Sequence, residues 1–267
     1  MSSADKPLVW FITGCSSGFG LTLAMLALRS GHKVIATSRN PSKTPELLQQ
    51  VESQGGIWLE LDITAEKEVM QTVLAQVQSL MNTNFIGPFN LIQAALPGMR
   101  AQKSGIIVNI SSAAGVDPRP AMGMYGASKF ALEGMSQGLA KEVAPFGIRV
   151  LIVQPGAFAT NMMNVVTMNS NPLSKGYEDT EVGKFMALFD GAQRAQNGKS
   201  FVAANDVEKG SQGIFEVVTG TGRGEGKEQH WRLPLSRDIA QRTKEQVERL
   251  QLGYETFRDI WENTGRD

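Results

Sequence analysis

Short apolar runs alternate with amphipathic stretches along most of the chain. The run 8–12 is continuously apolar and ends in a glycine-rich turn, which is typical of a parallel strand buried on both faces. Further runs predict strands at 33–37, 58–61, 105–110 and 149–153. Periodic stretches predict helices from 21 to Gly31, at 45–54 and 65–81, from 84 onwards, and at 124–143. This alternation indicates an α/β fold with a Rossmann-like, doubly wound parallel sheet.

The C-terminal part of the chain follows a different pattern. Residues 161–200 show no strand periodicity and are rich in methionine and phenylalanine, so we interpret them as a lid over a substrate. Ordinary core packing of one helix pair explains the same residues equally well. Residues 214–218 fit one more helix or strand. Residues 237–263 carry apolar side chains at helical spacing, which predicts an amphipathic tail that packs on the domain or on a second subunit.

Composition narrows the class of protein. The 267 residues fit a single domain, 1–267, with a substantial core. Lys+Arg and Asp+Glu are balanced at 26 each, which argues against nucleic acid as a partner. The single cysteine excludes an internal disulfide framework and fits a reducing, cytoplasmic compartment. The sequence shows neither a signal-peptide pattern nor a run of about 20 apolar residues, so we expect a soluble protein without a membrane span.

A glycine-rich turn joins the first expected strand to the first expected helix. Glycines allow a tight turn, and they bring backbone N–H groups and the positive end of the helix close to a pyrophosphate. Plain helix–strand packing is the alternative, and the GxxxGxG spacing departs from GxGxxG, which indicates one subclass of dinucleotide folds. The predicted phosphate-binding residues are Gly14, Ser16, Ser17, Gly18, Phe19 and Gly20.

Residues after the second and third strands indicate which dinucleotide binds. A carboxylate after the second strand binds the ribose 2′-hydroxyl, whereas a cation accommodates a 2′-phosphate. This chain has Arg39 there and no acid, which favours NADP (NADPH) over NAD; a solvated arginine is the alternative. Asp62 is a candidate to bind the adenine amino group, with the Ile63 amide assisting, or is only an N-cap for the next helix.

Tyr125 and Lys129 are four residues apart, which places a phenol and an ammonium on one helix face, one turn apart. A neighbouring cation stabilises the phenolate and lowers a pKa that is about 10 in a free tyrosine. We therefore predict that Lys129 lowers the pKa of Tyr125 and makes it an acid near neutral pH, with Ser112 as a second hydroxyl. The spacing alone is also that of an ordinary exposed helix turn, so the assignment depends on the other motifs.

Six motifs in one order resemble the short-chain dehydrogenase/reductase family. They lie nearest to its hydroxysteroid and retinol dehydrogenase branch and to related fungal reductases. The matching segments are TGCSSGFG at 13–20, Asp62, Asn84, Ile110-Ser111-Ser112, Tyr125-x-x-x-Lys129 and Pro155-Gly156-x-x-x-Thr160.

The resemblance implies a role for each matched residue. Tyr125 is expected to be the general acid/base, Lys129 to lower its pKa and bind the nicotinamide ribose, and Ser112 to hydrogen-bond the substrate oxygen. Asn84 is expected to hold a water molecule for proton relay. The stretch 155–160 is expected to line the nicotinamide, with a plain strand-ending turn as the alternative. The resemblance also implies a homodimer or homotetramer.

The chain departs from this family between its third strand and Asn84. Family members carry a central strand with an Asn-Asn-Ala-Gly motif there. Here the helix at 65–81 runs directly into 84–87, so about two to three dozen residues are absent. The neighbours of that strand are left with buried backbone groups that need other partners. Either the first strand and the strand at 105–110 pair directly, or the gap stays partly wet, or a truncated chain folds poorly.

The motifs support two hypotheses of different classes. The first is an NADP-dependent oxidoreductase, a short-chain alcohol dehydrogenase or carbonyl reductase, that interconverts a secondary alcohol and a ketone or aldehyde on a lipophilic small molecule. The second is a catalytically impaired dinucleotide-binding or scaffold protein, or a truncated isoform of such an enzyme, because the absent motif also lines the adenosine side of the cofactor.

Other chemically active side chains indicate no further site. His32 and His230 have no partner at metal-ligand spacing, and we expect both to be exposed. A helix N-terminus would lower the pKa of Cys15, but nothing resembles a redox pair, so we expect a structural role. Glu142 and Arg149 are expected to be surface charges.

Overall fold

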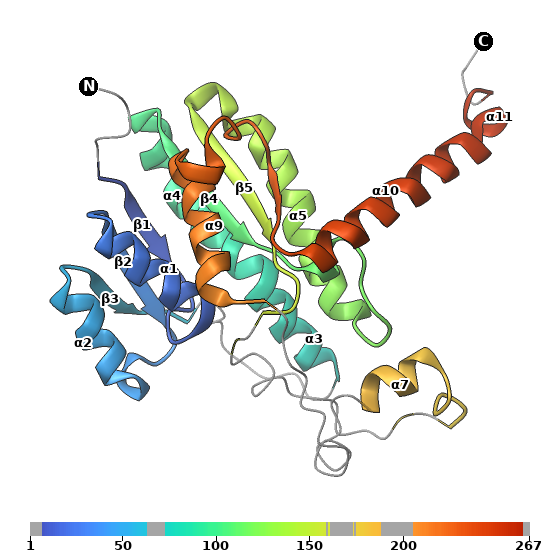
Figure 1. The fold of residues 1–267 in the computed structure, drawn as a ribbon, viewed down its shortest axis with the longest axis horizontal. Helices are drawn as coiled ribbons and strands as arrows, with labels where there is room; N and C mark the ends of the chain where they lie inside the picture. The colour runs from blue at the N-terminus through green and yellow to red at the C-terminus, as the bar shows by residue number, and fades with distance from the viewer. Residues whose placement is uncertain are drawn as a thin grey trace.

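A computed structural model of the chain describes residues 7–62, 73–158, 160, 173, 175–187 and 205–263. Figure 1 shows the order of the elements. The strands are β1 (Val9–Ile12), β2 (Lys33–Ser38), β3 (Ile57–Glu60), β4 (Gly105–Ile110), β5 (Ile148–Gln154) and β6 (Arg232–Pro234). The α-helices are α1 (Gly18–Arg29), α2 (Pro45–Ser53), α3 (Val73–Met81), α4 (Gly87–Gln102), α5 (Gly123–Val143), α7 (Glu181–Ala187), α9 (Val207–Thr219), α10 (Arg237–Thr256) and α11 (Arg258–Trp261). Short 3-10 helices are η2 (Pro41–Lys43), η4 (Ala113–Gly115), η5 (Ala144–Phe146) and η6 (Gly222–Gly224), and a π-helix, η3 (Asn82–Ile86), joins α3 to α4.

The strands form two separate three-stranded sheets, ordered β1-β2-β3 and β4-β5-β6. All pairings are parallel; Phe11 lies opposite Ile35 in the first sheet, and Val108 lies opposite Leu151 in the second. The expected parallel α/β fold is confirmed. In the described part of the chain no strand lies between β3 and β4, and β1 does not pair with β4. Direct pairing of these two strands, one of the three alternatives, therefore does not occur.

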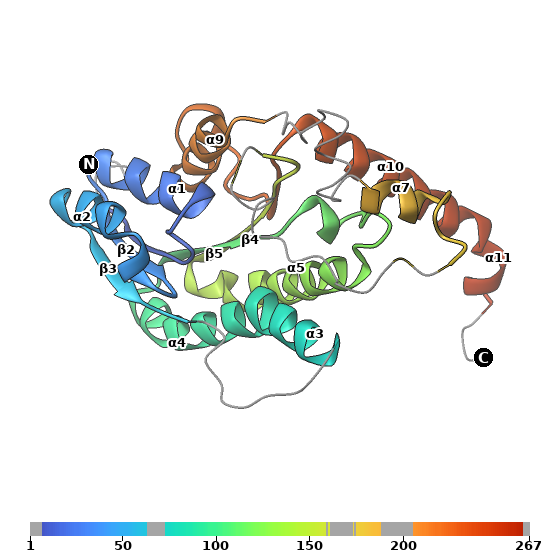
Figure 2. The ribbon, with the colours of Figure 1, turned by 90° about the horizontal axis from the view of Figure 1, so that it is seen from below.

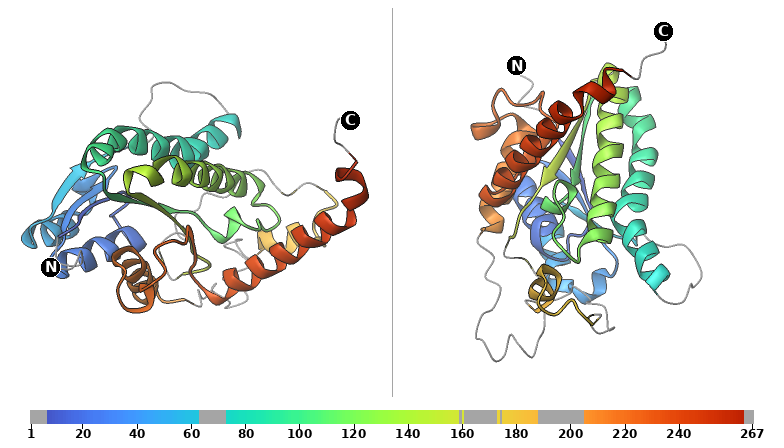
Figure 3. Two further views of the ribbon diagram at one scale, coloured as in Figure 1. Left: turned by 90° about the horizontal axis from the view of Figure 1, so that it is seen from above. Right: turned by 90° about the vertical axis from the view of Figure 1, so that its right-hand side faces the viewer.

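Helices cover the two sheets from opposite sides. Helices α1 and α9 lie on one face, and α4 and α5 lie on the other, which is below β4 and β5 in Figure 2 and above them in the left panel of Figure 3. One core cluster joins β1 and β2 to α1 and α9, and it extends to Leu151 and Val153 of β5. The Trp10 ring of β1 stacks on Phe215 of α9 with centroids 6.0 Å apart. Helix α9 therefore connects the two sheets through side chains.

The first strand is buried on only one face, so the prediction that it is covered on both faces is wrong. Trp10 and Trp58 are 8% and 6% exposed, whereas Phe11 and Leu59, which point the other way, are 49% and 47% exposed. The helices that follow β3 lie on the second sheet instead, because α3 continues through η3 into α4, and α4 packs against β4. In the described part of the chain, the shortened segment before Asn84 thus leads to a helix on β4, while Phe11 and Leu59 stay exposed.

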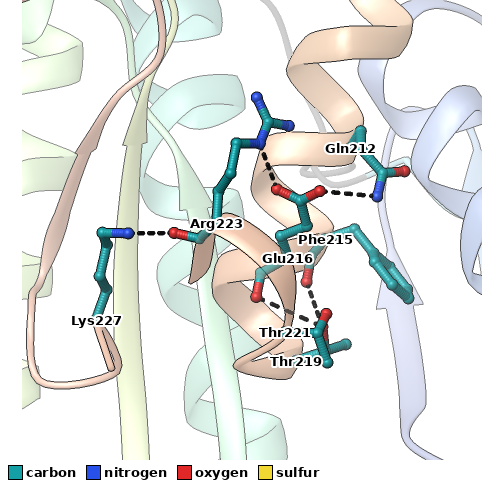
Figure 4. Close-up of polar contacts among 7 residues, drawn as sticks. All are labelled: Gln212, Phe215, Glu216, Thr219, Thr221, Arg223 and Lys227. Carbon is teal, nitrogen blue, oxygen red and sulfur yellow. Dashed lines mark hydrogen bonds and ion pairs between the residues drawn. The ribbon is translucent and has the colours of Figure 1, made fainter. Parts of the chain in front are cut away.

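The end of α9 is held by a network of polar contacts (Figure 4). Glu216 accepts hydrogen bonds from Arg223 Nε at 2.6 Å and from Gln212 Nε2 at 3.1 Å. These contacts, led by the Arg223 hydrogen bond, lower the pKa of Glu216.

Arg149 of β5 donates to the carbonyl oxygens of Val217 and Val218 at 3.3 Å. The expectation that Arg149 is a surface charge is therefore wrong, because its guanidinium caps the C-terminal carbonyls of α9.

The C-terminal tail is helical, as predicted. Helix α10 extends away from the sheets and is followed by α11 (Figure 1; Figure 3, left). Most of the expected lid, 161–200, lies outside the described residues, apart from Leu173, 175–187 and helix α7 within it. None of the described helices combines the length and the apolar character that a membrane crossing requires.

Candidate functional site

The glycine turn has the backbone geometry that a phosphate-binding loop needs. Gly14 and Gly18 have φ values of 70° and 59°, a region that favours glycine. A Cβ at Gly20 would overlap the Gly14 carbonyl oxygen, 2.6 Å away, so only glycine allows this close approach. The turn therefore has the shape that was predicted from its three glycines.

The start of α1 fits an anionic group. Its N-cap residue, Ser17, makes no side-chain capping hydrogen bond, and its first turn carries no acidic residue. Nothing lies within 4 Å of a Cβ built on Gly14, so there is space beside the turn. Uncapped N–H groups and the positive end of the helix dipole both favour a phosphate group. The residues present thus fit the pyrophosphate of a dinucleotide.

The turn lies against the segment that follows β5. A Cβ on Gly18 would sit 3.5 Å from the side chain of Thr160. The rings of Phe19 and Phe158 pack edge to face with centroids 4.8 Å apart. Thus the structure places Thr160 next to the predicted phosphate turn. Pro155 lies further back on this segment, where its carbonyl oxygen accepts a hydrogen bond from Ala113 N–H at 2.9 Å.

The residues predicted to choose the dinucleotide lie at the same ends of neighbouring strands. Arg39 directly follows β2 and Asp62 follows β3, and both are exposed. The two strand ends are linked by a hydrogen bond from Leu61 N–H to the Ser38 carbonyl oxygen at 2.9 Å. Ile63 lies outside the described residues. Arg39 and Asp62 thus stand at the strand ends where a dinucleotide on the α1 turn would extend.

Ser112, Tyr125 and Lys129 come together where β4 ends against α5. The Ser112 side chain lies close enough to the Tyr125 hydroxyl to favour its ionised form and so to lower its pKa. Lys129 Nζ lies 5.8 Å from the centroid of the Tyr125 ring and donates to the Ile110 carbonyl oxygen at 3.1 Å. Ser112 Oγ also accepts from Ala114 N–H at 3.2 Å, which fixes the start of η4. Two hydroxyls and one ammonium therefore lie close together at the end of β4; the helical spacing predicted this for Tyr125 and Lys129, and the resemblance added Ser112.

The pKa values differ from the prediction. Burial raises the pKa of Tyr125, and the nearby Ser112 side chain offsets this only in part. Burial lowers the pKa of Lys129 to about 8, against the opposing charge of Glu133. The predicted lowering of the tyrosine pKa by Lys129 is therefore absent, because burial dominates and the ammonium bonds to a backbone carbonyl. Tyr125 is protonated at neutral pH, which is the form that donates a proton.

Asn84 lies in the π-helix between α3 and α4. Its Nδ2 donates to Ser128 Oγ at 3.0 Å, and Ser128 Oγ donates to the Tyr125 carbonyl oxygen at 2.7 Å. Single π-helical turns inside longer helices are frequent at functional sites. The structure thus connects Asn84 to the helix turn that carries Tyr125 and Lys129, although the segment before Asn84 is shortened.

A buried carboxylate that the sequence did not predict lies beside this site. Glu133 of α5 is 4% exposed and accepts hydrogen bonds from Ser111 and Gln154. An available signal was its position four residues after Lys129, on the same helix face as Tyr125. Strand β6, which the sequence did not predict, contributes another partner of Glu133, because Arg232 Nε lies 3.2 Å from Glu133 Oε2.

The remaining candidates are structural. Cys15 is buried, and burial raises its pKa to about 11, so the lowering expected from a helix N-terminus does not occur. His32 is half-buried rather than exposed: its Nδ1 accepts from Leu8 N–H at 3.2 Å, and burial lowers its pKa. His230 is exposed, as expected. Among the described residues, no group of three or more histidine, cysteine or acidic side chains is placed to hold a metal ion.

Comparison with known proteins agrees with this geometry. The family model described as short chain dehydrogenase matches residues 8–78 and 71–171. The two matched segments overlap at residues 71–78, which include the first residues of α3. The overlap lies where the sequence predicts that a strand is absent.

Curated relatives show the same pattern. Oxidoreductase claN of Passalora fulva is 42% identical over 183 positions, covering 58% of this chain and 84% of that protein. Since 58% of 267 residues is about 155, this alignment holds about 28 positions more than the chain supplies, enough for a strand and its connection. The 3-ketodihydrosphingosine reductase of Bacteroides thetaiotaomicron is 39% identical, covering 58% of this chain and 65% of that one. Retinol dehydrogenase 8 of Homo sapiens is 32% identical, covering 59% and 61%.

Solved structures share the fold. A short-chain dehydrogenase from Streptomyces avermitilis has a TM-score of 0.78 at 26% identity and covers 99% of this chain and 100% of that one. A Burkholderia phymatum short-chain dehydrogenase/reductase in complex with NAD has a TM-score of 0.69 at 18% identity, covering 95% and 97%. A Sphingobium yanoikuyae short-chain dehydrogenase in complex with NADPH has a TM-score of 0.65 at 20% identity, covering 98% and 99%.

Proposed function

Because this chain belongs to the short-chain dehydrogenase family, we propose that it is an NADP-dependent oxidoreductase that interconverts a secondary alcohol and a ketone or aldehyde on a lipophilic small molecule. The observation that carries the proposal is the cluster of Ser112, Tyr125 and Lys129 at the end of β4. It lies in the sheet that also carries the segment leading to Thr160, and Thr160 lies against the glycine turn of the other sheet.

The cluster matches the chemistry of carbonyl reduction. When bound, the nicotinamide supplies the hydride that reduces the carbonyl carbon. Ser112 and Tyr125 offer two hydroxyl donors to the oxygen on which negative charge grows, and Tyr125 transfers its proton to that oxygen. The ammonium of Lys129 then stabilises the phenolate that remains. Asn84 supports the arrangement through Ser128, and we propose that it also holds a water molecule for reprotonation.

Arg39 supports NADP as the cofactor. A guanidinium pairs with a phosphate through two parallel hydrogen bonds, and no acid at this position competes for the ribose. We expect Arg39→Ala to weaken NADPH binding about tenfold, or about 1.4 kcal/mol, and to leave NADH binding unchanged. Titration of cofactor fluorescence measures both affinities. An equal change for the two cofactors would contradict the assignment.

A lipophilic substrate is supported by the apolar, methionine-rich stretch 161–200 and by the relative named as a 3-ketodihydrosphingosine reductase. We propose that the protein acts in the cytoplasm as a dimer or tetramer; the charge balance and single cysteine support the first, and family membership supports the second. A panel of ketones and aldehydes with increasing chain length tests the substrate class, with faster turnover of the longer members expected.

Replacing Tyr125 by phenylalanine tests the proposed reaction. The substitution removes the proton donor and little else, so we expect turnover to fall at least about a hundredfold, in line with general acid catalysis, while NADPH affinity stays within about twofold. Tyr254→Phe is the matched control, because Tyr254 is exposed on α10 and loses the same hydroxyl. Undiminished turnover in Tyr125→Phe would end the proposal.

A second candidate function is a catalytically impaired dinucleotide-binding or scaffold protein. The observation that favours it is the pair of sheets, between which the described strands form no backbone ladder, since the cofactor would lie across both. A cofactor that binds only the folded protein raises its melting temperature. NADPH that raises the melting temperature without supporting turnover of any carbonyl compound would favour this alternative; turnover would exclude it.

A further inference from the structure

Glu133 is a buried carboxylate that gathers donors from three strands. Ser111 Oγ donates to its Oε1 at 2.6 Å, and Gln154 Nε2 lies 2.9 Å from both carboxylate oxygens. Arg232 Nε donates to Oε2 at 3.2 Å. These partners stand at the end of β4, at the end of β5 and in β6. One side chain of α5 therefore binds all three strands of the second sheet.

Two of the three partners adjoin residues of the proposed site. Ser111 immediately precedes Ser112, and Gln154 immediately precedes Pro155. Glu133 itself follows Lys129 by one helical turn, so it lies on the face of α5 that carries the site. The carboxylate thus joins, through neighbouring residues, the helix and the strand ends that carry the proposed catalytic groups.

The backbone near Glu133 is shaped around its carboxylate. A Cβ at Gly115 would overlap both Ser111 Oγ and Glu133 Oε1, so only glycine leaves room for this hydrogen bond. Ser111 N–H also donates to the Val153 carbonyl oxygen at 2.7 Å, which holds β4 against β5 behind the carboxylate. The position of the carboxylate is therefore set by packing from several sides.

The described contacts bring three charged groups to this cluster. Lys129 and Glu133 come from α5, and Arg232, which is partly exposed, comes from β6. Strands β4 and β5 contribute Ser111 and Gln154, which are neutral. The negative charge of Glu133 raises the pKa of Lys129 against the effect of burial. Glu133 thus acts on Lys129 through its charge as well as on the strand ends through hydrogen bonds.

We propose that Glu133 is a positioning residue of the site: it fixes Ser112 and the turn after β5 relative to α5, and it keeps Lys129 in its charged form. This inference rests on the proposed function, since it assigns Glu133 a role in that reaction. The carboxylate acts through Ser111, Gln154 and the field at Lys129.

The test measures the titration of Lys129 in the full-length protein by NMR of ¹³C-labelled lysine, with the signal assigned from its loss in Lys129→Met. In Glu133→Gln the shape is kept and the charge removed, so we expect the midpoint to fall by about one pH unit, the scale of a neighbouring charge. Arg232→Gln removes a cation that pairs with Glu133 in competition with Lys129, so we expect the midpoint of Lys129 to rise. Glu142→Gln removes a charge from the exposed side of α5 and leaves the midpoint unchanged.

The same variants are assayed for turnover where they fold, as checked by circular dichroism. We expect kcat to fall about tenfold in Glu133→Gln with KM within twofold, and the decline of activity at high pH to begin at a lower pH. Glu133→Asp, which keeps the charge, retains the wild-type pH profile. A purely structural residue would change the melting temperature without moving this profile.

The outcomes separate the two proposals. Midpoints equal to the wild type in both Glu133→Gln and Arg232→Gln overturn the inference about Glu133, whatever the activity. If Glu133→Gln does not fold, Arg232→Gln decides by the sign of its shift: a rise supports the inference, and no change overturns it. The variants can shift the Lys129 midpoint as expected while the wild-type protein reduces no carbonyl compound. That result overturns the proposed function and leaves the charge coupling between Glu133 and Lys129 in place.

Discussion

Replacing Lys129 by methionine should make the protein more stable at neutral pH while it abolishes turnover. Lys129 is buried and bonds to the Ile110 carbonyl oxygen, and its burial lowers its pKa from 10.5 to about 8. At neutral pH the ammonium is therefore held in an environment that favours the uncharged amine. Methionine has a similar length and no charge, so it fills the same space without that cost.

The magnitude follows from the pKa difference. A difference of about 2.5 between the unfolded and folded pKa corresponds to about 3 kcal/mol, at about 1.4 kcal/mol for each pH unit. Losing the hydrogen bond to the Ile110 carbonyl oxygen reduces this gain in stability by about 1 kcal/mol. At pH 7 we therefore expect Lys129→Met to be about 2 kcal/mol more stable than the wild type, which is a rise of about 5 °C in melting temperature for a chain of this size.

The stability difference between the wild type and Lys129→Met should also change with pH in a definite direction. Between the folded pKa of about 8 and the unfolded value of 10.5, the unfolded wild-type chain binds more protons than the folded one. The stability of the wild type thus rises with pH through this window, relative to the variant. Urea unfolding of both proteins from pH 7 to pH 10.5 measures the difference, which should narrow as the pH rises. A difference that stays constant over this range would refute the view that Lys129 is a buried ammonium.

Three further predictions concern the rest of the fold. Phe11→Thr should change the free energy of unfolding by less than about 0.5 kcal/mol, whereas Trp10→Ala on the opposite face of β1 should cost about 3 to 5 kcal/mol; urea unfolding compares them, and equal losses would contradict the one-sided burial of β1. Arg149→Met should cost about 2 kcal/mol because it leaves carbonyl groups of α9 unpaired, and a neutral effect would show that water replaces the guanidinium. Cys15 should stay unreactive toward a thiol reagent at pH 8 until the protein unfolds, since burial raises its pKa to about 11; rapid labelling of the native protein would show that the thiol is accessible.

Local patterns in the sequence were sufficient to predict most of the elements. Strand β4 was predicted with its observed ends, and α5 differs from prediction by one residue at its start, because a continuous apolar run and a 3.6-residue period are local signals. The cluster of Ser112, Tyr125 and Lys129 was also predicted, since two of its members are one helical turn apart. Strand β6 was missed because it has only three residues, one of them a proline, which is too short a pattern.

The burial of β1 was not predictable from its own residues. Whether Phe11 faces a helix or solvent depends on where the chain goes after β3, which is a property of the whole fold. The same reason applies to Arg149 and Glu133. Both were unremarkable charges in the sequence, and their partners come from segments about 70 to 100 residues away, Val218 and Arg232. The departure from the family before Asn84 was the signal that the middle of the sheet would differ.

The separation of the two sheets bears on how the proposed reaction would depend on motion. The glycine turn belongs to one sheet and the proton donor to the other, and no backbone ladder joins β1 to β4 among the described residues. The two halves are held together by stacked rings and aliphatic contacts around α9, which resist sliding far less than strand pairing does. Slow amide exchange should therefore persist within each half while small rocking movements between them set how often donor and acceptor atoms meet. In such a protein the catalytic rate would depend on the rigidity of the aromatic packing between β1 and α9 rather than on the rigidity of a continuous sheet.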